Sequence, residues 1–219
     1  MTKKIGIALV GLGPGSEPHI ASLHALHDRV DWRWCVSRSG APQRQRLLPG
    51  SIRLTTDLNE VLADAAVDAV VLATPANTHL AITRQVLAAG KHTLVEKPLD
   101  VSLERAEELV RIAEASKLCF GVVLQHRFRP GAVRLRELLA SGALGELQAG
   151  MLQVPWWRSQ AGYYDQAGRG TRERDGGGVL LTQAIHSLDL FRSFVGVRKV
   201  VAAQVITTAL HSMETEDFV

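Results

Sequence analysis

The sequence contains little cysteine and no long hydrophobic run. Only two cysteines, Cys35 and Cys119, occur in 219 residues, and both fall inside short apolar segments without the paired spacing of a zinc site or a disulfide framework. No stretch approaches the roughly 20 apolar residues of a membrane-spanning helix, and the run Ile5–Val10 is too short for the core of a signal peptide. We therefore expect a cytoplasmic protein with no metal site and no membrane segment.

The excess of one sign of charge over the other is also small. The 25 Lys and Arg residues exceed the 22 Asp and Glu residues by three and are scattered along the chain, so a nucleic-acid-binding groove is not expected. Hydrophobic residues make up 46% and charged residues 21%, which is ordinary globular usage and argues against disorder. A chain of this length can bury the core of one large domain or of two modest ones.

Short apolar, β-branched segments alternate with helical patterns through the first half of the chain. This alternation is typical of βαβ units and predicts an α/β fold with a parallel sheet covered by helices on both faces. The expected helices include Thr78–Ala89, which stops at Gly90, and Ser102–Ser116, with Ser102 as the N-cap. The expected strands are Ile5–Val10, Trp32–Val36, Ile52–Leu54, Ala69–Ala73, Thr93–Val95 and Cys119–Leu124.

The pattern changes after Leu124, where we place the boundary between a first domain, residues 1–124, and a second domain, residues 125–219. Helical and alternating patterns both occur in the second domain. Its expected elements are a helix from Pro130 to Ser141, a strand over Glu146–Val154, a polar aromatic loop over Pro155–Asp175, a helix over Val179–Val195 and a strand over Val200–Thr208.

A glycine-rich loop directly follows the first expected strand and leads into a helix that begins near Pro14. Gly11, Gly13 and Gly15 allow a tight turn and a close approach of the backbone to a pyrophosphate at the helix N-terminus. Ser16 takes the place of the third glycine of the G-x-G-x-x-G pattern, and a residue this small still lets the helix pack on the strand. A plain glycine turn is the alternative, but the position after a buried strand favours a dinucleotide-binding loop.

The end of the second strand carries Ser37, Arg38 and Ser39, where an acidic residue usually binds the adenosine ribose of NAD. No carboxylate is available, since Asp31 precedes the strand. Two hydroxyls and a guanidinium suit a 2′-phosphate, so we predict NADP as the preferred cofactor, with NAD as the other possibility. A solvated surface loop is the alternative interpretation.

Several longer motifs resemble one known family. They are Ala73–His79, Ala89–Leu99 and Gly176–Gly178 together with Ile185–Asp189. They occur in family order and spacing and span nearly the whole chain, so the sequence resembles the Gfo/Idh/MocA family of glucose-fructose oxidoreductase and inositol dehydrogenase. The residues alone indicate only a dinucleotide-binding α/β protein with an attached second domain.

The resemblance implies an N-terminal Rossmann domain and a C-terminal α+β domain with an open, mostly antiparallel sheet, which the chain leaves incomplete at Val219. It implies NAD(P)-dependent hydride transfer between nicotinamide and a hydroxyl or carbonyl of a sugar, cyclitol or related small molecule. It also implies homodimers or homotetramers made through the C-terminal sheet.

Cofactor contacts outside the phosphate loop also follow from the resemblance. The residues concerned are Thr74, Pro75, Asn77, His79, Glu96, Lys97 and Gln125. For two of them an alternative is open, since His79 could equally belong to a helix cap and Gln125 could tie the two domains together.

Lys97 is the residue that we expect to be catalytic in the first domain. It follows a strand at its carboxyl end, where ligands of open α/β sheets bind. In the family this Glu-Lys-Pro lysine touches the substrate hydroxyl that is oxidised, where an ammonium can stabilise a developing alkoxide and pass a proton. Without the resemblance, a surface ion pair of Glu96 and Lys97 is the preferred interpretation.

Thr182, His186 and Asp189 lie on one side of a predicted helix whose other positions are mostly apolar. Such a polar stripe is costly unless it faces a site or a partner. The resemblance makes His186 the catalytic histidine, which relays a proton or binds the substrate; a core histidine bonded to Asp189 is the alternative. Many family members carry Asp at the position of Thr182, where a hydroxyl can orient an imidazole but cannot stabilise its charged form as a carboxylate does. We therefore expect the relay to rest on Lys97 and His186, and Thr182 to contact substrate or orient the histidine. Asp189 is expected to contact substrate.

Aromatic residues make up only 5% of the chain, yet several gather in the loop after Val154. Trp157 and Tyr164 offer flat faces for a sugar, and Arg158 and Arg169 can bind a carboxylate or phosphate. The family places this stretch beside the nicotinamide and the substrate, so all four are predicted substrate residues. Packing of the tryptophans against the second domain's sheet is equally open.

Two other function classes stay open on the sequence. A non-catalytic NADP-binding scaffold or regulator would bind cofactor without turning over an alcohol or ketone. An NAD-dependent glycoside hydrolase of the same superfamily would keep its nicotinamide bound, with no net change in redox state. The dehydrogenase is preferred because Lys97, His186 and the phosphate loop occur together.

Overall fold

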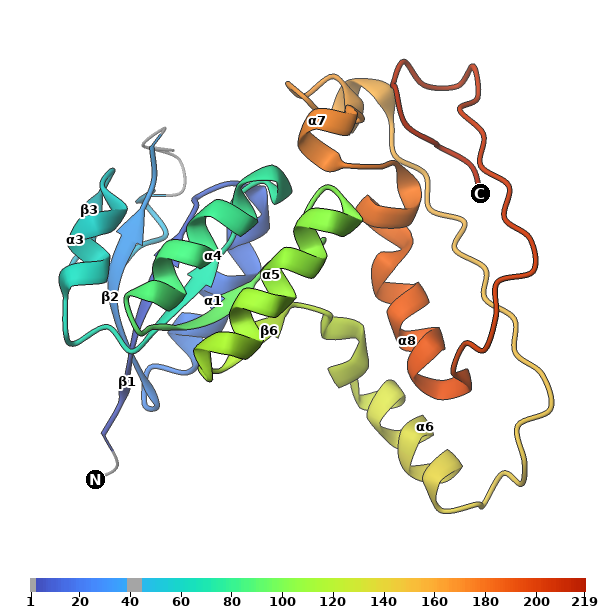
Figure 1. The fold of residues 1–219 in the computed structure, drawn as a ribbon, viewed down its shortest axis with the longest axis horizontal. Coiled ribbons are helices and arrows are strands. Elements are labelled where there is room, and N and C mark those ends of the chain that lie inside the picture. Colours follow the sequence, from blue (N-terminus) through green and yellow to red (C-terminus); the bar gives the residue numbers. More distant parts are fainter. Residues whose placement is uncertain (1–2, 39–44) are drawn as a thin grey trace. The chain divides into compact units, whose positions relative to one another are not determined.

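A computed structural model of the protein describes residues 3–38 and 45–219. The chain forms two compact units, Met1–Val123 and Leu124–Val219, and each is described by itself. The first unit contains a six-stranded sheet with helices, whereas the second consists of helices and extended segments (Figure 1).

All six strands of the first unit run parallel, as predicted. Their order in the sheet is β3-β2-β1-β4-β5-β6, which is the order of a Rossmann fold. The bounds are β1 Ile5–Val10, β2 Val30–Val36, β3 Arg53–Thr55, β4 Ala69–Leu72, β5 His92–Val95 and β6 Phe120–Val122. The order reverses between β1 and β4, so a ligand is expected beyond the carboxyl ends of these two strands.

Helices cover both faces of this sheet, because alternate strand residues point to opposite sides. Leu9 of β1 packs in one core with Ile20 of α1. Its neighbour Val10 packs in a second core with Val61 of α3 and Val86 of α4. The helix bounds are α1 Glu17–Ala25, α3 Leu58–Ala63, α4 His79–Ala88 and α5 Leu103–Ser116. Burial on both faces explains why the central strands β1 and β4 are continuously apolar.

Two helix ends are formed by the capping residues that the sequence predicts. The Ser102 hydroxyl accepts a hydrogen bond from the backbone N–H of Arg105 at the start of α5. Gly90 follows α4 with a φ of +73°, a left-handed conformation that favours glycine. The predicted helices Thr78–Ala89 and Ser102–Ser116 are therefore confirmed to within one residue at each end.

The second unit is largely helical where it has regular structure. The bounds are α6 Pro130–Ala140, α7 Arg172–Asp175 and α8 Ile185–Val195, with π-helical turns over Gln160–Tyr164 and Leu180–Ala184. The predicted helix Val179–Val195 forms, although its first turn is π-helical and therefore wider than expected. The predicted loop Pro155–Asp175 is likewise interrupted by a π-helical turn and by α7.

The two strands predicted for the second unit do not form. Within Leu124–Val219, all of which the structure describes, the only pairing is an isolated antiparallel bridge between Ile206 and Phe218. Residues 146–154 and 200–208 have alternating side chains, but a strand also needs a neighbouring edge for its backbone hydrogen bonds. These residues supply no such edge to one another, so the predicted antiparallel sheet is not built from them.

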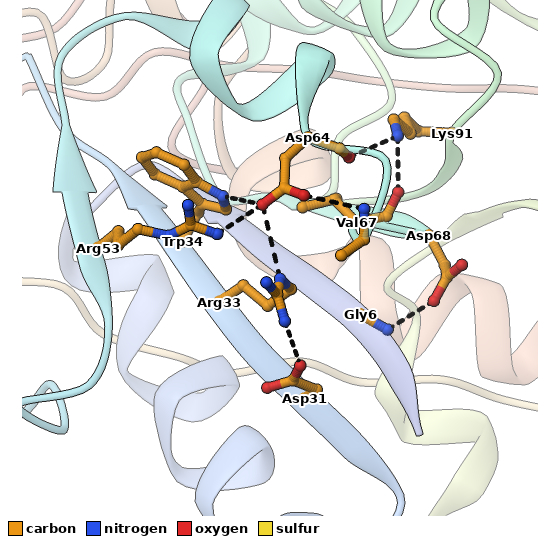
Figure 2. A network of polar contacts seen from close by, with 10 residues as sticks. Gly6, Asp31, Arg33, Trp34, Arg53, Asp64, Val67, Asp68 and Lys91 are labelled. Carbon is orange, nitrogen blue, oxygen red and sulfur yellow. Dashed lines mark hydrogen bonds and ion pairs between the residues drawn. The ribbon is translucent and has the colours of Figure 1, made fainter. Parts of the chain in front are cut away.

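A polar network centred on Asp64 ties the loop after α3 to β2 and β3 (Figure 2). Its carboxylate accepts hydrogen bonds from the Trp34 indole at 2.8 Å, the Arg53 guanidinium at 2.5 Å and the backbone N–H of Ala66 at 2.9 Å. Arg33 adds an ion pair at 3.5 Å. These groups, with Trp34 contributing most, favour the ionised form and hold the pKa of Asp64 well below its usual range.

Within residues 3–38 and 45–219, no helix is long and apolar enough to cross a bilayer. The same residues contain no group of three or more His, Cys, Asp or Glu side chains placed to hold a metal ion. The two thiols differ in environment. Cys35 is buried and Cys119 is exposed. Burial raises the pKa of the Cys35 thiol to about 12.

Candidate active site

The glycine-rich loop lies at the carboxyl end of β1, where the strand order reverses. Gly11 has a φ of +102°, and a Cβ there would lie 2.6 Å from the carbonyl oxygen of Ala73, so this position requires glycine for internal packing. Gly13 and Gly15 differ, because a Cβ on either would meet none of the described atoms within 4 Å. A glycine backbone facing open space before a helix suits a pyrophosphate, so the loop fits the phosphates of a dinucleotide.

Pro14 and Ser16 complete the loop. Pro14 is exposed and begins a 3₁₀ turn over Pro14–Ser16, which runs directly into α1. Ser16 is fully buried, and its hydroxyl donates to the carbonyl oxygen of Gly13 at 2.7 Å. The serine therefore takes the place of the third glycine without loss of packing between the helix and the strand.

Ser37 and Arg38 follow β2, the neighbour of β1, and so lie at the same edge of the sheet as the phosphate loop. The N–H of Gly11 donates to the carbonyl oxygen of Val36 at 2.9 Å, which joins the loop to the end of β2. Ser37 is buried and Arg38 is exposed. Ser39, the third residue of the predicted phosphate contact, lies outside the described residues.

Thr74, Pro75 and Asn77 lie beyond the carboxyl end of β4, on the other side of β1. The hydroxyl of Thr78 donates to that of Thr74 at 2.7 Å, and Pro75 is exposed. The structure therefore brings these three predicted cofactor residues to one edge of the sheet with the phosphate loop.

His79, the first residue of α4, is held between backbone carbonyl groups. It is 1% exposed. Its Nδ1 lies 3.0 Å from the carbonyl oxygen of Pro98 and 3.2 Å from that of Leu99, and its Nε2 lies 3.0 Å from that of Thr74. The ring thus joins the segments that follow β4 and β5, and a direct contact of His79 with a cofactor stays a prediction.

Glu96 and Lys97 directly follow β5, so they lie at this edge as well. One carboxylate oxygen of Glu96 lies 2.7 Å from Nε2 of His19, and the other accepts from the backbone N–H of Lys97 at 3.1 Å. Sequence reasoning missed His19. The available signal was a histidine in the first turn of the helix that follows the phosphate loop.

In the second unit, His186 is buried near the start of α8. Its ring lies 5.1 Å from the ring of His126, measured between centroids. Burial, aided by the positive charge of Arg129, lowers the pKa of His126. A second imidazole therefore accompanies the predicted catalytic histidine.

The other predicted residues of this helix make contacts within the same unit. Thr182 lies in the π-helical turn, and its hydroxyl donates to the carbonyl oxygen of Gly178 at 2.8 Å. Asp189 accepts hydrogen bonds from the Arg127 guanidinium through both carboxylate oxygens. Gln125 is exposed in the 3₁₀ turn before α6. Contacts of these residues with substrate or cofactor stay predictions.

The aromatic loop gathers its predicted substrate residues into one cluster, made of Trp157, Arg158, Tyr164 and Arg169. The two aromatic rings both pack on His211, with each pair of centroids 4.8 Å apart. The two guanidinium groups both lie over the ring of Tyr163, at 5.2 Å for Arg158 and 4.9 Å for Arg169. The four predicted substrate residues are therefore grouped around the rings of His211 and Tyr163.

His211 and Asp217 anchor this cluster, and sequence reasoning missed both. Nδ1 of His211 lies 2.7 Å from Oδ2 of Asp217, and its Nε2 lies 2.8 Å from the carbonyl oxygen of Arg158. Burial alone would raise the pKa of Asp217, but hydrogen bonds from Thr208 and His211 together lower it. Neither residue belongs to a recognisable motif, so only the tertiary contact reveals them.

Known protein families match both units. The oxidoreductase family with an NAD-binding Rossmann fold matches residues 5–124, and the GFO/IDH/MocA C-terminal domain matches residues 132–219. The chain belongs to the Gfo/Idh/MocA oxidoreductase family. The predicted resemblance is thereby confirmed, and the first unit of this Gfo/Idh/MocA chain is an NAD(P)-binding Rossmann domain.

Curated relatives and solved structures agree with this assignment. Uncharacterized oxidoreductase sll0816 of Synechocystis is 29% identical over 207 residues, covering 93% of this chain and 55% of that protein. The scyllo-inositol 2-dehydrogenase (NADP(+)) IolW of Bacillus subtilis is 26% identical over 219 residues, covering 99% of this chain and 58% of that protein. The WlbA dehydrogenase of Bordetella pertussis, solved in complex with NADH and UDP-GlcNAcA, has a TM-score of 0.89 at 30% identity, covering 98% of this chain and 65% of that one. The chain thus spans little more than half the length of these two curated relatives.

Proposed function

We propose that this Gfo/Idh/MocA chain acts as an NAD(P)-dependent oxidoreductase that transfers a hydride between nicotinamide and a hydroxyl or carbonyl of a sugar, cyclitol or related small molecule. One observation carries the proposal: the open glycines Gly13 and Gly15 and the Lys97 segment occupy a single edge of the Rossmann sheet. Ligands of such sheets bind at this edge. When bound, the cofactor supplies the nicotinamide ring that accepts or donates the hydride.

NADP is the proposed preferred cofactor. The exposed guanidinium of Arg38 and the hydroxyl of Ser37 stand where a carboxylate would bind an unmodified ribose. A guanidinium pairs well with a 2′-phosphate. The segment Ser37–Ser39 also lacks an acidic side chain, which would repel such a phosphate. The relative that is named for NADP(+), the scyllo-inositol 2-dehydrogenase, supports this choice.

Lys97 and His186 are the proposed proton-handling residues. When the hydroxyl is oxidised, Lys97 is assigned to take up its proton as a neutral amine. When the carbonyl is reduced, the resulting ammonium is assigned to stabilise the developing alkoxide and to return the proton, since a cation at that oxygen favours the transition state. His186 is assigned to pass that proton on or to bind the substrate. The aromatic cluster of Trp157 and Tyr164, with Arg158 and Arg169, is assigned to the substrate.

The roles of the two domains, the assembly of the protein and its cellular location are also part of the proposal. We assign residues 1–124 to cofactor binding and residues 125–219 to substrate binding and assembly. The alternating segments 146–154 and 200–208 are proposed to join an open antiparallel sheet once further strands pair with them, and a homodimer or homotetramer is proposed to form through it. A cytoplasmic location completes the proposal and agrees with the unpaired cysteines.

Cofactor binding is the first test. The protein is titrated with NADPH and then with NADH, and energy transfer from tryptophan to the nicotinamide is followed. Saturable binding with NADPH preferred by about tenfold or more is expected, and the variant Arg38→Ala is expected to lose most of that preference. Tighter binding of NADH would contradict the NADP proposal, and absence of binding by the folded protein would contradict the whole function.

Substrate turnover is the second test. Scyllo-inositol, other cyclitols, aldoses and UDP-sugar acids are offered with NADP, and formation of NADPH is followed by its ultraviolet absorbance. We expect the wild type to turn over a substrate and Lys97→Ala to lose this turnover to a far greater extent than it loses cofactor affinity. Tight NADPH binding without turnover of any alcohol or ketone would favour the scaffold function instead.

A further inference from the structure

The segment that carries Lys97 is held on both sides by histidines from two different helices. On its amino-terminal side, His19 of α1 contacts the carboxylate of Glu96. On its carboxyl-terminal side, the ring of His79 of α4 contacts the carbonyl oxygens of Pro98 and Leu99. The backbone on either side of Lys97 is therefore fixed by contacts from helices that lie far away in the sequence.

The contact between His19 and Glu96 is short and shielded from solvent. Nε2 of His19 lies 2.7 Å from Oε1 of Glu96, and the two side chains are only 11% and 19% exposed. A hydrogen bond to a carboxylate is stronger than one between neutral groups, and exclusion of water strengthens it further. This pair is therefore well suited to restrain the end of β5.

The restraint passes from Glu96 directly to Lys97. Oε2 of Glu96 accepts a hydrogen bond from the backbone N–H of Lys97 at 3.1 Å, while Oε1 is engaged by His19. Each carboxylate oxygen thus has one assigned partner. Loss of His19 would free the carboxylate to rotate, and the hydrogen bond to the Lys97 backbone would weaken with it.

The helix that supplies His19 is also the helix that follows the phosphate loop. A cofactor whose phosphates sit on Gly13 and Gly15 would rest against the beginning of this helix. The same helix therefore places the cofactor's phosphates and, through its first-turn histidine, the backbone of the lysine. This link through α1 would hold Lys97 at a fixed distance from the bound dinucleotide.

We propose that His19 is a positioning residue, which acts through Glu96 to hold Lys97 in register with the bound dinucleotide. The inference rests on the proposed function of Lys97. A displacement of about 1 Å at a reacting group can lower turnover by about two orders of magnitude. The His19 ring contacts Glu96, whereas the phosphates are proposed to rest on Gly13 and Gly15. Its loss should therefore reduce turnover far more than cofactor affinity.

Two variants of His19 and one matched control test this inference. His19→Leu removes the donor at similar bulk, and His19→Gln places an amide N–H₂ near the position of Nε2. His24→Leu is the control, because His24 lies on the same helix and contacts the carbonyl oxygen of Leu47 instead. Three quantities are measured: the Kd for NADPH, the exchange rate of the Lys97 backbone amide hydrogen, and kcat and KM for the substrate found by the turnover screen.

In His19→Leu, kcat is expected to fall by about tenfold or more and the Lys97 amide to exchange about tenfold faster, while the Kd for NADPH changes by less than about threefold. His19→Gln is expected to recover most of both losses, because it restores a donor to Glu96. His24→Leu is expected to behave as the wild type. If His19→Leu does not fold, Glu96→Gln serves in its place. The glutamine has only one acceptor oxygen, so it can accept a hydrogen bond from His19 or from the Lys97 N–H but cannot accept both as the carboxylate does.

Several results would overturn the proposal. Unchanged amide exchange and turnover in His19→Leu would show that Lys97 does not depend on this contact, and equal losses in His19→Leu and His19→Gln would show that the donor is irrelevant. A much weaker affinity for NADPH with normal Lys97 exchange would assign His19 to cofactor binding instead. If the wild type binds cofactor but turns over no substrate, the proposed function fails, and the exchange rates alone still decide whether His19 holds Lys97.

Discussion

Both carboxylate oxygens of Asp189 accept hydrogen bonds from the guanidinium of Arg127, although the two residues are 62 positions apart in the sequence. Asp189 is 12% exposed and Arg127 is 40% exposed. The pair joins α8, which carries His186, to the turn that carries His126. Asp189, which the sequence assigns to substrate, therefore also has a structural partner in Arg127. A role in substrate binding and a role in stability lead to different predictions.

Replacement of Asp189 by Asn is expected to lower the free energy of unfolding by about 2 kcal/mol, because the partly buried guanidinium loses its charged acceptor. Urea denaturation followed by circular dichroism measures the change. Glu137→Gln is the control, since the exposed pair of Arg134 and Glu137 should contribute less than about 0.5 kcal/mol. An Asp189→Asn protein of normal stability that has lost activity would show that this carboxylate serves the substrate rather than the fold.

Substitutions of two glycines in the phosphate loop should affect different properties, stability in one case and cofactor affinity in the other. Gly11→Ala is expected to destabilise the protein by more than about 1 kcal/mol, because its φ is +102° and its Cβ would meet the Ala73 carbonyl oxygen. Gly13→Ala meets no described atom within 4 Å, so its stability should be unchanged. Its affinity for NADPH should nevertheless fall by about tenfold or more, since the methyl group occupies the space offered to the phosphates.

Thermal unfolding and the tryptophan titration provide the two measurements for these glycine variants. A Gly13→Ala protein that binds NADPH as tightly as the wild type would place the phosphates elsewhere. A Gly11→Ala protein as stable as the wild type would show that the β1 end can relax away from Ala73.

Much of the first unit could be predicted because its signals are local. Buried parallel strands are continuous apolar runs, and the capping residues Ser102 and Gly90 act within one turn of their helices. The carboxyl-end position of Lys97 follows from its place directly after a strand. Such features depend on neighbours in the sequence, so the pattern alone suffices to place them.

The side-chain pairs that complete the site could not be predicted, because they join distant parts of the chain. His19 and Glu96 are 77 positions apart, and only the folded first unit brings the first turn of α1 to the residue that follows β5. His211 and Asp217 are close in sequence, but the cluster that they anchor depends on the aromatic loop. The strands expected at 146–154 and 200–208 failed for a related reason, since alternation indicates a face but supplies no partner edge.

The two cysteines should differ sharply in reactivity. Burial raises the pKa of the Cys35 thiol to about 12, whereas Cys119 is exposed. At pH 8 iodoacetamide is expected to modify Cys119 in the native protein and Cys35 only after unfolding, because the thiolate is the reactive species and must also be accessible. Mass spectrometry of peptides counts the adducts, and rapid native labelling of Cys35 would show that the α1 face of the sheet opens readily.

The Asp64 network should make stability depend on pH in a defined direction. Its carboxylate has a depressed pKa in the folded protein, so it stabilises the fold above the unfolded value of about 4 and loses this contribution as the pH falls through the folded pKa. Asp64→Asn is therefore expected to lower the free energy of unfolding by about 2 kcal/mol at pH 7. The deficit should persist to pH 5 and shrink below pH 4.

Urea denaturation of the wild type and Asp64→Asn between pH 7 and pH 3 measures this deficit. Asp31→Asn is the matched control, because Asp31 pairs with Arg33 at the surface and its own side chain is 49% exposed, so its loss should cost less than about 0.5 kcal/mol. NADPH affinity should be unchanged in Asp64→Asn, since Asp64 precedes β4 while the cofactor is proposed to bind beyond the carboxyl ends of the strands. A deficit that stays constant down to pH 3 would mean that the uncharged contacts of Asp64, and not its ionised carboxylate, hold β2 and β3 to the loop after α3.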